Sequence, residues 1–282
     1  MNLPSLFLYV ILLCLGLGLS SCKSTYEKIR TSNDAPLMLK AANDYYKKKD
    51  WVRAQALYEL ALSSYRGQKE ADDLYYNYAD CHYQLSEYEM AAHLFKNYSI
   101  TFPNNPRKEE AEFLAAYAIY KTSPGFRLDQ SGTAKAIEAL QAFVNTYPES
   151  KKVGECNQLI DNLRLKLETK ALEQGRLYLD TKHYQAGITT LENLLTDFPE
   201  TKEDREIRYL IAKASFELAE NSIFEKQKER YLQAVEKAEL FQKRYTGGKY
   251  AQEIKKIKED AKSKAKNQKY DRYQSTSIGN KS

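Results

Sequence analysis

Two stretches of this sequence repeat one pattern, and that pattern decides the fold. Residues 42–58 read ANDYYKKKDWVRAQALY, and residues 79–95 read ADCHYQLSEYEMAAHLF. Their alanines and aromatic residues match when the stretches are aligned 37 residues apart. A short polar turn, ending in Asp50-Trp51 or Glu87-Tyr88, separates two segments whose apolar residues have helical spacing. The sequence therefore predicts pairs of helices that repeat along the chain.

The residue types explain how each pair would pack. Two antiparallel helices approach closely only where small residues face each other, so we expect crossings at Ala42–Ala54 and at Ala79–Ala91. Larger side chains fill the space beside each crossing. Because proline cannot continue a helix, an aromatic residue before proline predicts the end of a pair. Such ends occur at Phe102-Pro103, Tyr147-Pro148 and Phe198-Pro199, and a fourth end, after Tyr245, has glycines instead.

The spacing of these ends predicts about five pairs between Pro36 and Tyr245, with two departures. An inserted loop, Ser123–Gly132, separates the helices of the third pair, and a long helix between Lys151 and Thr181 begins the fourth. No segment alternates at period two for long enough to predict a strand. The pattern resembles the tetratricopeptide family. That resemblance implies an all-α, right-handed solenoid whose concave surface can hold an extended peptide.

The N-terminal segment predicts export and a lipid anchor. An almost unbroken apolar run, Leu6–Leu19, is too short to span a membrane but fits a secretory signal. The run ends in Leu19-Ser20-Ser21-Cys22, which resembles the bacterial lipobox. This resemblance implies lipidation of Cys22, palmitate being a usual acyl chain. Several acyl chains on one residue would hold the protein on a membrane. The alternative is an ordinary signal peptide with a chance cysteine.

Charge and cysteine content set further limits. Residues 249–282 contain ten Lys or Arg and four acidic residues, so the formal charge of +5 is local to this tail. We expect a solvated helix that ends in disorder. Contact with an anionic lipid or an acidic partner is the alternative, and an exported protein gives no reason to expect nucleic acid. Cys81 and Cys156 lie in helical patterns, which favours buried thiols over a disulfide.

The chain contains no recognisable catalytic, cofactor or metal-binding motif. His82, His93 and His183 are scattered, and no carboxylate or thiol stands at ligand spacing from them. His82 occupies an aromatic position of the repeat, so packing explains it better than catalysis. We therefore expect a protein that binds other proteins, with no enzymatic activity, metal or cofactor.

The inserted loop and the helix after it carry a more specific resemblance. The residues concerned are Ser123-Pro124, Leu128-Asp129-Gln130, Thr133, Lys135-Ala136-Ile137, Leu140-Gln141, Phe143 and Tyr147-Pro148. With a lipobox and five repeats, they resemble the BamD family, the lipoproteins of the outer-membrane β-barrel assembly machine. This resemblance implies a periplasmic-facing outer-membrane protein. Its partners would be the barrel-forming assembly subunit with periplasmic repeat domains and unfolded outer-membrane clients. A periplasmic repeat lipoprotein that scaffolds cell-wall synthesis or division is the alternative.

The same resemblance suggests where partners bind. Candidate client-binding residues occupy the concave positions of the first two repeats: Leu39, Asn43, Tyr46, Tyr76, Asp80 and Tyr83. Tyr46 and Tyr83 could equally cover the core between repeats. Candidate partner-binding residues in the loop are Phe126, Leu128, Asp129 and Gln130, unless Phe126 and Leu128 fold back onto the helices. The expected organisation is a signal peptide (1–21), a lipidated linker (22–35), the repeats (36–248) and the basic extension (249–282).

Overall fold

The computed structural model describes residues 24–278 of the chain, with side chains for residues 24–267. Throughout residues 24–278 the regular structure is helical, with twelve α-helices, one short 3-10 helix and no strand. The predicted all-α class is therefore confirmed. The helices form two compact units. Unit 1 covers the described residues up to Ser123 together with Ala134–Asn157, and unit 2 covers Pro124–Thr133 and the described residues from Gln158 onward.

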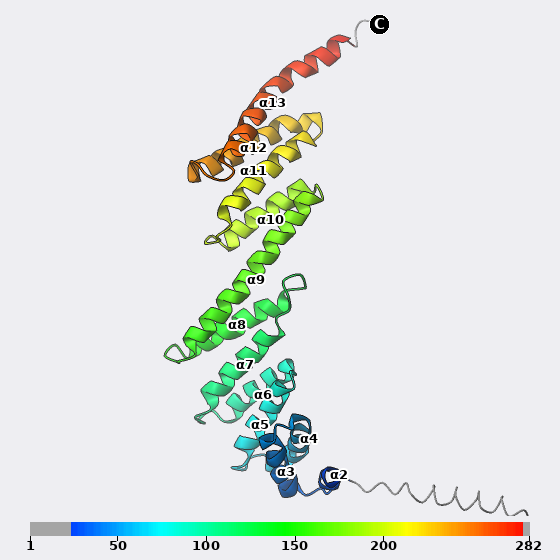
Figure 1. Cartoon of the computed structure of the whole chain (residues 1–282), viewed down its shortest axis with the longest axis vertical. Coiled ribbons are helices and arrows are strands. Elements are labelled where there is room, and N and C mark those ends of the chain that lie inside the picture. Colours follow the sequence, from blue (N-terminus) through cyan, green and yellow to red (C-terminus); the bar gives the residue numbers. More distant parts are fainter. Residues whose placement is uncertain (1–23, 279–282) are drawn as a thin grey trace, which may run out of the picture. The chain divides into compact units, whose positions relative to one another are not determined.

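Figure 1 shows the helices in chain order, from α2 in blue to α13 in red. Those of unit 1 are α2 (Thr25–Arg30), α3 (Ala35–Lys47), α4 (Trp51–Ala61), the 3-10 helix η1 (Leu62–Tyr65), α5 (Ala71–Gln84), α6 (Tyr88–Thr101) and α7 (Lys108–Thr122). Those of unit 2 are α10 (Tyr184–Asp197), α11 (Asp204–Glu220), α12 (Phe224–Arg244) and α13 (Ala251–Ile278). Both α8 (Ser131–Thr146) and α9 (Val153–Asp180) contribute residues to each unit. The predicted five pairs are α3/α4, α5/α6, α7/α8, α9/α10 and α11/α12.

One turn geometry recurs between the two helices of a pair. Lys49, Ser86 and Lys182 adopt left-handed conformations, with φ angles of 60°, 63° and 62°. The residue after each donates its N–H to a carbonyl near the end of the first helix, as Asp50 does to Tyr45 over 2.9 Å. A left-handed residue after a helix lets the chain reverse while such carbonyls stay hydrogen-bonded. The first, second and fourth pairs therefore share one turn.

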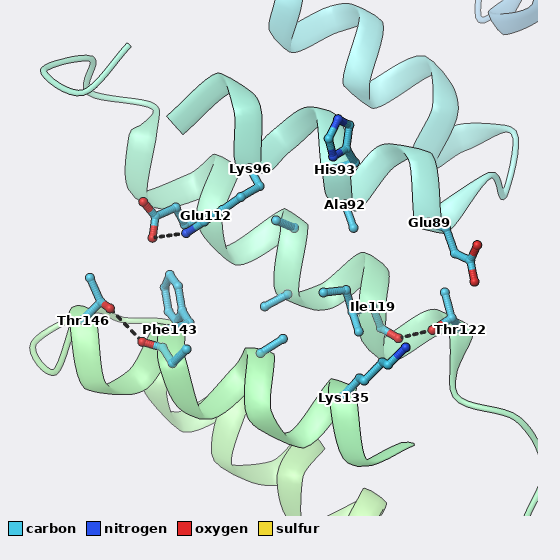
Figure 2. Close-up of a pocket in the computed structure, with 14 residues that line it drawn as sticks. Glu89, Ala92, His93, Lys96, Glu112, Ile119, Thr122, Lys135, Phe143 and Thr146 are labelled. Carbon is cyan, nitrogen blue, oxygen red and sulfur yellow. Dashed lines mark hydrogen bonds and ion pairs between the residues drawn. The ribbon is translucent and has the colours of Figure 1, made fainter. Parts of the chain in front are cut away.

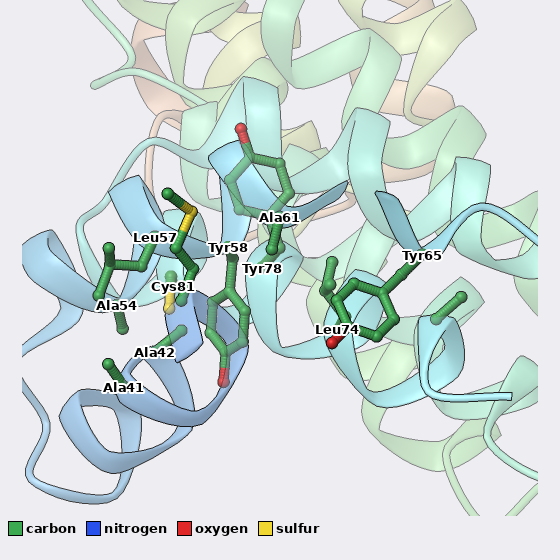
Figure 3. Close-up of a cluster of buried hydrophobic side chains, with 12 residues drawn as sticks. Ala41, Ala42, Ala54, Leu57, Tyr58, Ala61, Tyr65, Leu74, Tyr78 and Cys81 are labelled. Atoms are coloured by element: carbon green, nitrogen blue, oxygen red, sulfur yellow. The ribbon is translucent and has the colours of Figure 1, made fainter. Parts of the chain in front are cut away.

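The expected small-residue crossings are confirmed. Ala42 and Ala54 are fully buried in one cluster, and Ala79 and Ala91 are fully buried in another. Figure 3 shows the first cluster, in which Ala42 of α3 and Ala54 of α4 lie with Tyr58. Alanine permits the close approach, and the large ring fills the space beside it.

The two cysteines that the structure describes, Cys81 and Cys156, are buried free thiols. Cys81 and Cys156 are 0% exposed and form no disulfide. Burial, with a smaller effect of Asp80, raises the pKa of the Cys81 thiol to about 12, and burial, with Glu155, raises that of Cys156 to about 11. The interpretation as small apolar core residues therefore agrees with the structure.

The C-terminal basic helix differs from the solvated helix expected from its charge. Ile254, Ile257, Ala261 and Ala265 of α13 are buried, in a stripe at helical spacing. The described part of α13 packs against α11 and α12 and caps the last pair. A short apolar stripe among many lysines is easily overlooked, since the mean composition of the helix is polar.

Two further N-terminal features bear on the expected organisation. The segment assigned to a linker contains α2, whose Tyr26 and Ile29 pack against the first core cluster. Cys22 lies outside the described residues. Within residues 24–278, none of the helices combines the length and apolar character needed to cross a bilayer.

Candidate functional site

The six candidate residues of the first two repeats lie on α3 and α5, the first helices of their pairs. All six are partly buried, so each contributes to packing and retains some exposed surface. Leu39 packs against the first core cluster, and Asn43 Oδ1 accepts a hydrogen bond of 2.7 Å from the Tyr58 hydroxyl. These two residues therefore mainly support the face that the other four share.

Tyr46 and Asp80 join the first repeat to the second. The Tyr46 hydroxyl donates a hydrogen bond of 2.5 Å to Asp80 Oδ2, and Gln84 Nε2 donates one of 3.1 Å to the other carboxylate oxygen. Burial, reinforced by Asp80, raises the pKa of Tyr46 well above its usual value. The hydroxyl therefore remains a donor, and this half of the candidate set also has a structural role between repeats.

Tyr76 lies beneath a guanidinium group. The guanidinium carbon of Arg107, which precedes α7, lies 4.7 Å from the centroid of the Tyr76 ring. Its Nη2 atom lies 2.5 Å from a carboxylate oxygen of Asp72 and 2.8 Å from one of Asp73. Burial and the neighbouring Glu110 carboxylate raise the pKa of Tyr76. Arg107 thus covers Tyr76 while its own charge is neutralised by two carboxylates.

Tyr83 belongs to a longer series of rings. Its centroid lies 5.5 Å from Tyr88 and 6.3 Å from Tyr117 of the third repeat, and Tyr117 stacks on Tyr120 at 5.6 Å. Tyr46 and Trp51 form a separate pair of rings in the first repeat, with centroids 5.2 Å apart. We refer to this pair together with Tyr83, Tyr88, Tyr117 and Tyr120 as the aromatic row. The candidate set omitted Tyr117 and Tyr120, although adding the 37-residue step to Asp80 and Tyr83 leads to them.

The candidate residues of the inserted loop are held in an ordered turn. Gln130 is buried, and its Nε2 donates to the carbonyls of Gly125 and Leu128 over 2.8 and 3.0 Å. Lys170 of α9 also donates to the Leu128 carbonyl. Leu128 is 62% exposed, so it does not fold back onto the helices as one interpretation required, whereas Phe126 is partly buried. Hydrogen bonds from Ser131 lower the pKa of the exposed Asp129.

A groove that sequence reasoning missed lies between α6 and α8, beside α7 (Figure 2). Its cavity volume is about 720 Å³. Small residues leave this space: Ala92, Ala115, Ala116, Ala139 and Ala142 line it, with the larger Ile119 and Phe143. Lys96 and Glu112 form an ion pair of 3.8 Å at one end. The alanines are visible in the sequence, but the separation of α6 from α8 is not.

The chemistry of the aromatic row suits noncovalent binding. Partly buried rings offer apolar area together with hydroxyl groups, which favours segments rich in apolar side chains with polar groups between them. The row extends over three successive repeats, so it can contact several residues of an extended segment.

Comparison with known proteins places this chain in a family. Residues 31–221 match the family model YfiO, described as outer membrane lipoprotein. The chain is 24% identical over 133 residues to the outer membrane protein assembly factor BamD of Caulobacter vibrioides, covering 47% of this chain and 44% of that protein. It is 23% identical over 207 residues to the protein of the same name from Rickettsia prowazekii, covering 72% and 81%.

The chain thus spans less than half the length of the Caulobacter relative. A solved structure, the TPR2AB domain of yeast Sti1 in a pHSP90 complex, is similar over 81% of this chain and 98% of its own, with 14% identity and a TM-score of 0.38. The family model matches well over half of the sequence, from just before α3 to the end of α11. The chain therefore belongs to the YfiO family of outer membrane lipoproteins, the BamD family.

Proposed function

We propose that this protein is the lipoprotein subunit of an outer-membrane β-barrel assembly complex and that its aromatic row receives unfolded barrel clients. The family match over residues 31–221 carries the proposal, and two relatives named as assembly factors support it. In this proposal acylated Cys22 holds the chain on the periplasmic face of the outer membrane. The protein acts as a scaffold and has no catalytic role.

The residues that would contact a client are those of the aromatic row together with Tyr76 and Asp80. Strands of membrane barrels alternate apolar and polar side chains. Rings that carry hydroxyl groups can contact both kinds, which supports the aromatic row as the receiving surface. Leu39 and Asn43 would contribute from beneath by holding α3 in place.

A double variant, Tyr83→Ser with Tyr117→Ser, tests this surface. We expect the amount of barrel protein in the outer membrane to fall several-fold, because two neighbouring rings of the row are lost. Ile100→Ala serves as the control, since it removes an exposed apolar side chain from the end of α6 opposite Tyr88. The double variant Tyr83→Phe with Tyr117→Phe keeps both rings and should retain most of the barrel protein in the outer membrane. Normal barrel levels in the serine variant, with a normal melting temperature, would refute the client-binding role.

The inserted loop is the proposed contact with the barrel-forming subunit. Leu128 is an exposed apolar side chain on a turn that Gln130 and Lys170 hold by hydrogen bonds. A preformed turn loses little conformational entropy on binding, which favours its use as a contact. Phe126 and Asp129 would flank Leu128 in this contact.

Leu128→Ser tests the loop without shortening it. Because the side chain is 62% exposed, the variant should fold normally but co-purify with several-fold less of the barrel-forming subunit. Leu165→Ser is the matched control, as Leu165 is a 59% exposed leucine on α9. Equal co-purification of both variants and the unmodified chain would exclude Leu128 from the interface.

A further inference from the structure

The first repeat is joined to the proposed lipid anchor by very little chain. Helix α2 begins at Thr25, and its N-cap Ser24 accepts a hydrogen bond of 3.3 Å from the N–H of Glu27. A chain extends by at most about 3.6 Å per residue, so the Cα atom of Cys22 lies within about 7 Å of that of Ser24. A lipid on Cys22 would therefore bring the start of α2 to the membrane surface.

Helix α2 is fixed to the end of the first pair at which α3 leads into α4. The Tyr26 ring lies edge-on to the ring of Tyr45, near the end of α3, with centroids 5.8 Å apart. The guanidinium carbon of Arg53, near the start of α4, lies 5.6 Å from each of these two centroids. Ile29 packs against the first core cluster. The turn between α3 and α4 therefore lies beside α2, on the side of the repeat that is near the anchor.

This turn carries three consecutive lysines, Lys47, Lys48 and Lys49, which we call the lysine turn. All three are exposed, and throughout residues 24–267 no carboxylate lies within ion-pair distance of them. The next residue, Asp50, pairs with Arg53 at 2.9 Å instead. The lysine turn therefore presents three positive charges that no ion pair balances.

Folding does not account for these lysines. In the second repeat the same turn has Gln84, Leu85 and Ser86, and Ser86 adopts the left-handed conformation that Lys49 adopts in the first. The positive charge is also local. Residues 23–53 contain eight Lys or Arg and four acidic residues, whereas residues 54–248 contain 25 and 30. The segment nearest the anchor is thus positive, and the repeats that follow it carry a net negative charge.

We infer that the lysine turn, with Val52 beside it, docks on anionic phospholipid headgroups of the leaflet that holds the anchor. Headgroup phosphates have the complementary charge, and an anionic membrane attracts lysines that lie within the screening length, about 8 Å at physiological ionic strength. Val52 is 62% exposed and adds an apolar contact with the interface. The anchor and the lysine turn together fix the orientation of the first repeat. The inference rests on the proposed function only through the lipid on Cys22.

The test measures which end of α4 touches the membrane. The acylated full-length chain carries the fluorophore nitrobenzoxadiazole on a thiol introduced by Val52→Cys, while the thiols of Cys81 and Cys156 stay unlabelled because they are 0% exposed. The vesicles contain phosphatidylcholine and phosphatidylglycerol in equal parts, with a lipid whose headgroup bears a quenching nitroxide. The matched probe uses Leu60→Cys, at an exposed apolar residue of the other end of α4. The first probe should be quenched strongly and the second weakly.

Removal of charge assigns this contact to the lysines. Each lysine near an anionic surface favours contact by about fivefold, so Lys47→Gln with Lys48→Gln should shift the ratio of docked to undocked chain by about 25-fold. Quenching of the first probe should then fall to that of the second. Arg66→Gln with Lys69→Gln is the matched control, since it removes two exposed charges from the loop after η1, and it should leave quenching unchanged. Vesicles of phosphatidylcholine alone, or about 1 M salt, should act like the lysine variant.

Equal quenching of the two probes in the unmodified chain would overturn docking on lipid and leave the lysines to an acidic protein partner. Strong quenching of the first probe that persists in the lysine variant would show that headgroup charge is not recognised. The proposed anchor fails in a different way. In that case the unmodified chain does not float with phosphatidylcholine vesicles in about 1 M salt, where screening leaves only the lipid on Cys22 to hold it.

Discussion

At the scale of single residues, a few buried polar groups connect helices that are distant in sequence. In unit 2, Asp204 begins α11 and is only 5% exposed. Its carboxylate accepts hydrogen bonds from Arg208 over 3.0 Å and from the Tyr245 hydroxyl over 2.5 Å, and Arg244 lies 2.9 Å away. Asp204 therefore holds the start of α11 to the end of α12.

The electrostatics of Asp204 predict a stability that depends on pH. Burial acts to raise the pKa of this carboxyl, but the hydrogen bonds from Arg208 and Tyr245 and the charges of Arg208 and Arg244 outweigh it and hold the pKa below 3.8. A lowered pKa stabilises the folded state at pH values above the unfolded pKa. This contribution is lost as the pH falls from 3.8 through the folded pKa.

Asp204→Asn should lower the free energy of unfolding by about 1.5–3 kcal/mol at pH 7, since it removes the charge from a hydrogen-bonded buried group. The measurement is urea unfolding of the full-length chain, followed by circular dichroism at pH 7 and at pH 3. The difference from the unmodified chain should shrink at pH 3. Asp161→Asn, at an exposed position of α9, should change little at either pH. A difference independent of pH would show that the charge of Asp204 is unimportant.

At the scale of helices, α9 and α10 of the fourth pair approach each other closely at glycine residues, which have no side chain. A Cβ atom added to Gly175 of α9 would lie 2.5 Å from Leu191 Cδ2 of α10, and Leu191 is fully buried. Gly175 and Gly187 are the small residues where α9 and α10 approach each other, and the structure shows why position 175 needs one. Leu191 occupies the volume that a larger residue at position 175 would need.

Gly175→Ala should be less stable than Gly154→Ala by about 1–3 kcal/mol, the usual cost of overpacking a core. Gly175 lies in the interior of α9, where the exchange also gains about 1 kcal/mol of helix propensity, whereas Gly154 lies in the first turn and gains less. Gly154 differs because nothing lies within 4 Å of its added Cβ. Thermal and urea unfolding of the two variants provide the comparison. Equal stabilities would mean that Leu191 can move aside at little cost.

At the scale of the whole molecule, the proposed function requires the repeats to remain at a membrane surface. The lipobox-like ending Leu19-Ser20-Ser21-Cys22 motivates an anchor on Cys22. A single acyl chain gives marginal binding, whereas two or three hold a protein stably. The anchor would keep the aromatic row and the inserted loop close to the membrane into which barrels are assembled.

Cys22→Ser should abolish labelling of the chain by a radioactive or alkyne-bearing fatty acid and release the protein from washed membranes. The folded repeats should be unaffected, so the melting temperature of the released protein serves as the control. If the variant stays with the membranes after a high-salt wash, lipid on Cys22 is not the anchor. Protein contacts would then be responsible.

The sequence alone determined the helix pairs, their register and the crossings at Ala42–Ala54 and Ala79–Ala91. These features could be predicted because each pair is built from residues close together in the chain. Small and large side chains at fixed helical spacing are enough to specify such packing. The family could be predicted for a related reason, since the inserted loop and its following helix form one continuous segment.

Only the tertiary structure decided which polar groups meet and which surfaces stay open. Tyr46 bonds to Asp80, and Arg107 to Asp72, across more than thirty intervening residues. The same holds for the groove between α6 and α8 and for the packing of α13 on α11 and α12. Apolar periodicity shows which face of a helix is buried. An ion pair, an open groove or a free charge depends instead on where side chains from distant segments lie in space, and no local pattern records that.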